Sequence, residues 1–130
     1  MTLNATEIFS LSRLGFIFYE RGRPQKALAI FHGLLHLDPN YAYGWYIVGL
    51  IRRDQEDLPG AVEALEHALT CAPQHWAARV ALAELYHRSE QLAHALSTLK
   101  PMLRLAEENR PALEQATLRR AKTLWHCWQR

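Results

Sequence analysis

The sequence predicts an all-α protein built from repeated pairs of helices. Leu and Ala are the commonest residues of the 130-residue chain, and both are strong helix formers. Val and Ile, which favour strands, are scarce. Residue types also recur at intervals of 34, a length typical of a helix–turn–helix unit.

The period of 34 divides the chain into three repeats, over residues 8–41, 42–75 and 76–109, and leaves a C-terminal segment at 110–130. Proline, glycine and alanine all follow this spacing, at Pro39 and Pro73, at Gly15 and Gly49, and at Ala27, Ala61 and Ala95. Small residues let two helices approach closely, and large residues between them fill the groove. We expect seven helices, near residues 5–20, 24–37, 41–54, 58–71, 75–88, 92–106 and 110–128.

Residues with turn and capping chemistry separate these helices. Gly22 can close the first helix in the left-handed conformation, and Pro24 can open the second. Asp57 can cap the fourth helix and Asn109 the seventh. Pro101 falls inside the sixth helix, where it removes a backbone hydrogen bond and predicts a kink.

Two motifs recur when the repeats are aligned. The first helices read Leu11, Leu14, Gly15 and Phe18, then Trp45, Val48, Gly49 and Arg52, then Arg79, Leu82, Ala83 and Tyr86. The second helices read Ala27, Phe31, Leu34 and Pro39, then Ala61, Leu65, Ala68 and Pro73, then Ala95, Leu99, Met102 and Glu107. This pattern resembles the tetratricopeptide repeat family, whose first helix favours Trp-x-x-Leu-Gly-x-x-Tyr. The resemblance implies a solenoid of three repeats in one domain over residues 1–130, with the motif residues in its core.

The segment 110–128 is predicted to be a capping helix, because a solenoid cannot bury its own open end. Its apolar stripe contains Leu113, Ala116, Ala121, Leu124, Trp125 and Trp128. Residues 110–130 carry a net charge of +4, from five basic residues against Glu114. We interpret this charge as a solvated outer face, with an acidic or phosphate-bearing partner as the alternative.

The first helices carry a second apolar stripe that a single core does not require. In the first helix the predicted core residues are Leu11, Leu14, Gly15 and Phe18, and the second stripe lies about 200° around the helix. In tetratricopeptide repeat proteins these positions line a concave groove, so the resemblance implies that the groove is aromatic at its N-terminal end. The candidate groove residues are Phe9, Ser12, Phe16, Tyr19, Tyr43, Tyr46, Leu50, Arg53, Val80, Glu84 and His87.

An aromatic groove suits an apolar segment of a partner protein, either extended or as an amphipathic helix. Arg53, Glu84 and His87 could set its register at the polar end. Residues 1–7 or a second copy of the chain could cover the same face, so a homodimer is an alternative. A clamp for a C-terminal carboxylate is not expected, because its positions hold Ser12, Phe16, Ala77 and Ala81.

A short three-repeat chain with an aromatic groove also resembles the tetratricopeptide repeat chaperones of bacterial type III secretion. The closing sequences Leu37–Asp38–Pro39 and Cys71–Ala72–Pro73 support this resemblance. It implies a chaperone or adaptor that holds an export substrate or a component of the secretion apparatus. A repeat scaffold in another pathway is the alternative interpretation.

Catalytic and metal chemistry is not expected. His32 and His36 share a helix face but have no third ligand, and no phosphate loop or catalytic triad is present. We therefore predict a protein that is not an enzyme and needs no cofactor. The net charge of +2 makes nucleic acid the less favoured partner class.

The chain is also expected to be soluble and cytoplasmic. The longest apolar run, Trp45 to Ile51, is too short to cross a bilayer, and no signal peptide is evident. Cys71 and Cys127 form no disulfide framework.

Overall fold

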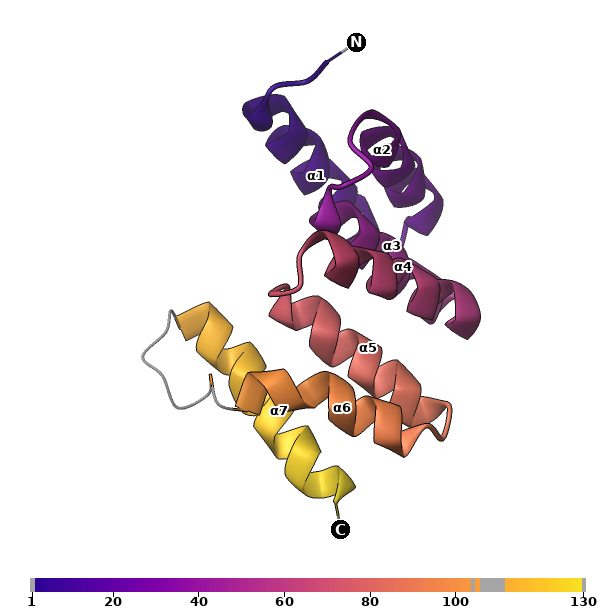
Figure 1. Cartoon of the computed structure of the whole chain (residues 1–130). Coiled ribbons are helices and arrows are strands. Elements are labelled where there is room, and N and C mark those ends of the chain that lie inside the picture. The colour runs from indigo at the N-terminus through magenta and orange to yellow at the C-terminus, as the bar shows by residue number, and fades with distance from the viewer. Residues whose placement is uncertain (1, 104, 106–111, 130) are drawn as a thin grey trace. The chain divides into compact units, whose positions relative to one another are not determined.

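The computed structural model describes residues 2–103, 105 and 112–129, which form seven α-helices and no strand (Figure 1). This confirms the all-α prediction with seven helices. The predicted bounds agree with the observed ones to within three residues; the largest difference is at α6, predicted to end at residue 106. The helices are α1 (Ala5–Glu20), α2 (Pro24–Leu37), α3 (Ala42–Asp54), α4 (Leu58–Cys71), α5 (Trp76–Arg88), α6 (Leu92–Leu103) and α7 (Ala112–Trp128).

The helices belong to two compact units, Met1–Ala72 and Pro73–Arg130. In the first unit α1 pairs with α2, α3 pairs with α4, and α3 also contacts α1 and α2. In the second unit α5 pairs with α6, and α7 contacts both of them. The organisation of residues 1–130 as one domain stays a prediction.

Glycines bring paired helices into close contact, as the sequence predicts. A Cβ atom placed on Gly15 of α1 would lie 2.7 Å from Cε2 of Phe31 on α2. A Cβ atom placed on Gly49 of α3 would lie 2.8 Å from Cγ of Leu65 on α4. Phe31 and Leu65 are fully buried, so each glycine leaves the space that a core side chain fills.

The turns within the repeats share one backbone geometry. Gly22, Glu56 and Glu90 are 34 residues apart and all have positive φ angles, of 74°, 61° and 62°. The left-handed conformation expected at Gly22 is therefore present, and two glutamates adopt it as well. Asp57 caps α4 as predicted, because its Oδ1 accepts a hydrogen bond of 3.1 Å from the Gly60 N–H. The proposed cap at Asn109 lies outside the described residues.

The predicted core of the first helix is wrong at two positions. Leu11 and Leu14 are 36% and 44% exposed, whereas Gly15 is buried and Phe18 is half-buried. Ser12, which the sequence assigned to the second stripe, is 3% exposed. Its hydroxyl shares a hydrogen bond of 2.6 Å with the Tyr41 hydroxyl at the start of α3. Helix α1 therefore meets its neighbours through Ser12 and Gly15, and this orientation leaves the two leucines exposed.

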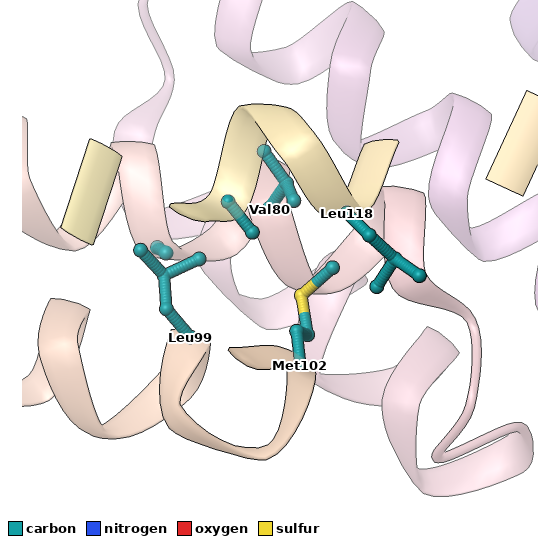
Figure 2. Packing of buried hydrophobic residues seen from close by; sticks show 6 residues of the cluster. Val80, Leu99, Met102 and Leu118 are labelled. Carbon is teal, nitrogen blue, oxygen red and sulfur yellow. The ribbon is translucent and has the colours of Figure 1, made fainter. Parts of the chain in front are cut away.

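The core of the second unit is built from α5, α6 and α7 together (Figure 2). Its fully or nearly fully buried residues are Val80, Ala83, Leu99, Met102, Leu118 and Ala121, and partly buried Trp76, Leu105, Leu124, Trp125 and Trp128 pack against them. Helix α7 thus covers the apolar faces of α5 and α6, as a capping helix should. Leu118 belongs to this core although the predicted stripe omitted it, and Ala116 is exposed although the stripe included it. The side chain of Leu113 lies outside the described residues.

Pro101 lies inside α6 without ending it. The helix continues to Leu103, and Met102 immediately after the proline is fully buried in the core. The packing of this last turn against α7 holds the helix across the missing backbone hydrogen bond.

Candidate partner-binding groove

A hollow of about 560 Å³ lies between α1 and the start of α3 in the first unit. Its lining combines aromatic and aliphatic side chains with two charges: Phe9, Ser12, Arg13, Phe16, Ile17, Glu20, Tyr41 and Tyr43. Four of the candidate groove residues, Phe9, Ser12, Phe16 and Tyr43, therefore come together in one concave site. Phe9 is the most open of them, with 62% of its surface exposed.

Tyrosine rings form the α3 side of this hollow and continue beyond it. The ring centroid of Tyr43 lies 6.1 Å from that of Tyr41 and 6.2 Å from that of Tyr46. Tyr43 also meets the buried ring of Phe31 edge-on at 6.0 Å. Burial raises the pKa of Tyr43 above its usual value, and the neighbouring Tyr41, Tyr46 and Glu20 add to the shift. These contacts hold the ring of Tyr43 in place against the core.

Beyond the hollow, a polar cluster joins the ends of α1 and α3. The Tyr19 hydroxyl donates a hydrogen bond of 2.9 Å to Oδ2 of Asp54. Arg53 pairs with Oδ1 of Asp54 at 3.1 Å and donates to the Tyr19 hydroxyl at 3.5 Å. Burial and the bond to Asp54 raise the pKa of Tyr19 to about 12. Leu50 is 8% exposed, so it contributes packing rather than an open surface.

The three candidate residues of the third repeat all contact α7. Val80 is 5% exposed and belongs to the core, so its assignment to an open groove is wrong. Oε1 of Glu84 accepts a hydrogen bond of 2.8 Å from Nε of Arg120. The ring of His87 stacks on Trp128 with centroids 4.5 Å apart. The capping helix therefore occupies the side of α5 that the repeat pattern had assigned to a partner.

Two sequence-family models, both described as tetratricopeptide repeat, match residues 13–75 and 52–119. The second match alone spans more than half of the chain. The chain belongs to the tetratricopeptide repeat family. No curated protein sequence matches it.

Solved structures with the same fold include two chaperones. PcrH from Pseudomonas aeruginosa has a TM-score of 0.84 and 21% identity, covering 98% of this chain and 96% of PcrH. A second PcrH structure, a complex with the chaperone binding region of PopD, has a TM-score of 0.84 and 21% identity, covering 98% of this chain and 94% of that one. The type III secretion chaperone SycD of Yersinia enterocolitica, in complex with a peptide of the translocator YopD, has a TM-score of 0.82 and 19% identity. The match covers 97% of this chain and 95% of SycD.

The structure accounts for two departures from the tetratricopeptide repeat motif. Arg79 replaces the usual Trp, and its Nη2 donates to the Pro73 carbonyl at 3.0 Å. Trp45, 34 residues earlier, donates through Nε1 to the Pro39 carbonyl at 2.9 Å. Arg52 replaces the usual aromatic residue and donates to the Gly60 carbonyl on α4 at 3.1 Å. Arg79 therefore joins the third repeat to the end of the second, and Arg52 joins the two helices of the second repeat.

Sequence reasoning missed four residues of the hollow: Arg13, Ile17, Glu20 and Tyr41. Arg13 and Glu20 flank Phe16 by three and four residues, a spacing that places all three on one side of α1. That spacing is a usable signal, but Arg13 and Glu20 are charged and so do not belong to an apolar stripe. Tyr41 precedes α3, and its position depends on how the loop after Pro39 turns.

Other candidate chemistry finds no support in the described part of the chain. His32 and His36 are exposed, and no three His, Cys, Asp or Glu residues come together as a metal site among residues 2–103, 105 and 112–129. Cys71 and Cys127 are free thiols. No helix among these residues is long and apolar enough to span a membrane.

Proposed function

We propose that this tetratricopeptide repeat protein is a chaperone or adaptor that binds an apolar segment of another protein in the hollow between α1 and α3. The observation that carries the proposal is the aromatic lining of that hollow, above all the exposed ring of Phe9. The protein acts by binding rather than by catalysis, and it acts in the cytoplasm.

The exposed part of Phe9 is large enough to matter for affinity. A Phe side chain buries about 200 Å², so the 62% that is exposed corresponds to about 120 Å². At about 25 cal/mol per Å², covering this surface contributes up to about 3 kcal/mol, part of which offsets the entropy lost on association. A segment that covers Phe9 and its neighbours is therefore held mainly by apolar contact.

The structural neighbours support a place in type III secretion. PcrH has been solved with the chaperone binding region of PopD, and SycD with a peptide of the translocator YopD. We propose that the present chain likewise holds a secreted partner before export. An apolar segment aggregates when it is exposed to water, and the aromatic lining of the hollow fits such a segment.

The test uses the full-length chain as bait in its native host, with one variant in the hollow and one matched control. Phe9→Glu places a charge in the hollow, and Leu92→Glu places the same charge on another exposed apolar side chain, which is 42% exposed at the start of α6. Wild type and Leu92→Glu should co-purify the same secreted protein, and Phe9→Glu should lose it. Retention by Phe9→Glu would show that the hollow is not the binding site.

Self-association is a second candidate function that a separate observation favours. Leu11, Leu14 and Ile17 are each at least 36% exposed on α1, so one edge of this helix is apolar and open. We propose that a second copy of the chain covers this edge in the absence of a partner. Sedimentation over a wide concentration range should show a dimer for wild type and a monomer for Leu14→Glu; a wild type that is monomeric throughout would refute the idea.

A further inference from the structure

Two charged side chains without an ionic partner flank the apolar hollow. Arg13 and Glu20 both line it and are exposed, and neither charged group forms a hydrogen bond or ion pair with the described residues. They lie seven residues apart on α1, which corresponds to about 10.5 Å along the helix axis. Glu20 and Tyr43 both line the hollow, and the charge of Glu20 adds to the raised pKa of that phenol. One end of the hollow is therefore positive and the other is negative.

We infer that the bound segment carries an acidic residue that meets Arg13 and a basic residue that meets Glu20, with apolar residues between them. This inference rests on the proposed function and adds the charge pattern of the partner to it. An extended chain advances about 3.1–3.4 Å per residue, so about three residues span the 10.5 Å between the two charges.

The charged residues that the sequence offered for setting the register are already engaged. Arg53 pairs with Asp54 and bonds to Tyr19, Glu84 pairs with Arg120, and His87 stacks on Trp128. Arg13 and Glu20 are the charged residues that line the hollow itself, so they select the partner's charges by direct contact.

The inference can be tested with labelled twelve-residue peptides whose sequences differ only at two positions. Each peptide carries a central Leu–Leu pair, flanked by Asp and Lys, by two Asp, by two Lys or by two Ser. The full-length protein is used as wild type, Arg13→Glu, Glu20→Lys and Phe16→Glu. Arg21→Glu is the matched control, because Arg21 is exposed at the end of the same helix but does not line the hollow. Binding is measured by fluorescence anisotropy at low and high salt.

Wild type should prefer the Asp/Lys peptide over both like-charged peptides by about three- to tenfold, and high salt should remove the preference. Arg13→Glu should shift the preference to the two-Lys peptide and Glu20→Lys to the two-Asp peptide, whereas Arg21→Glu should behave as wild type. Equal binding of all four peptides, or the same shift in Arg21→Glu, would overturn the inference. If the Ser-flanked peptide then still binds wild type but not Phe16→Glu, the proposed function stands; if no peptide binds, both fail.

Discussion

Gly15→Ala should destabilise the protein, although Ala is the better helix former. The new Cβ atom would lie 2.7 Å from Cε2 of Phe31 and 3.2 Å from Cγ2 of Ile30, closer than carbon atoms approach without strain. Overpacking of this kind costs about 1–3 kcal/mol, and the gain in helix propensity returns about 0.5–1 kcal/mol. We therefore expect a net loss of up to about 2.5 kcal/mol, because Phe31 is fully buried and its ring meets the new Cβ atom directly.

Gly33→Ala is the matched control within the same helix pair. Gly33 lies on α2, and no described atom outside its own helix turn would come within 4 Å of its Cβ atom. This variant should gain about 0.5–1 kcal/mol, since only helix propensity changes. Urea unfolding followed by circular dichroism should therefore separate the two variants by about 1–3 kcal/mol.

A second measurement identifies the contact that causes the loss. Phe31→Leu shortens the side chain that meets Gly15, so the double variant should lose less stability than the sum of the two single variants. If Gly15→Ala proves as stable as Gly33→Ala, or if the two losses simply add, the close approach of α1 and α2 does not depend on this glycine.

Three further predictions concern the turns and the ionisable groups. Gly22→Ala should lower the free energy of unfolding by about 0.5–1 kcal/mol in urea titrations, because its φ of 74° disfavours a side chain although no described atom crowds the site. His75 accepts a hydrogen bond from the Ala78 N–H through Nδ1, and burial lowers the pKa of His75 below 6.5. Protonation removes this cap, so the free energy of unfolding should fall as the pH falls below about 6.5. His75→Asn should reduce the difference in melting temperature between pH 7.5 and pH 5, and an unchanged difference would contradict the assignment. In an ultraviolet titration, wild type should show a phenol that ionises with a pKa of about 12, and Tyr19→Phe should lack it. Because this pKa lies above the ordinary 10.0, the free energy of unfolding of wild type should fall as the pH rises from 10 to 12.

The helices were predictable from the sequence because local chemistry sets their ends. Gly22 and Pro24 close one helix and open the next, and Asp57 caps α4, all within a few residues of the position that they control. The period of 34 added the pairing of helices, since a glycine and a large residue meet at Gly15 and Phe31 as the repeat pattern requires.

The two faces of a first helix were harder to predict than the helix itself. Leu14 and Val48 hold the same repeat position, yet Leu14 is 44% exposed and Val48 is fully buried. The difference lies in the neighbours: α3 packs extensively against both α2 and α4, whereas α1 packs extensively against α2 and touches α3 only lightly. A repeat pattern assigns the same neighbours to every copy, so it cannot show where a neighbour is missing.

The same reasoning explains the error at Val80. Ser12 and Val80 hold one repeat position, and both are buried by a helix or loop that follows in the chain: Ser12 by Tyr41, and Val80 by α7. The fold thus uses part of the second stripe to join one first helix to the next, and only the remainder stays open. In the first unit that remainder is Phe9, Phe16 and the tyrosines of α3, which is why the hollow forms there.

Contacts between the paired helices tolerate a change of chemistry at one position of the motif. Phe18 lies under the ammonium group of Lys26 at 5.4 Å, Arg52 donates to the Gly60 carbonyl, and the rings of Tyr86 and His94 are 5.3 Å apart. Each of these pairs joins the same two repeat positions, 34 residues apart along the chain. A cation–π contact, a hydrogen bond and a ring contact therefore serve one structural purpose, since each needs only a long side chain that reaches across the pair. Because this junction accepts different chemistry, the departure from the family motif at Arg52 does not weaken the assignment of the fold. In the first unit this junction uses Phe18 and Lys26, so it leaves Phe9 and Phe16 of the same helix pair available to line the hollow.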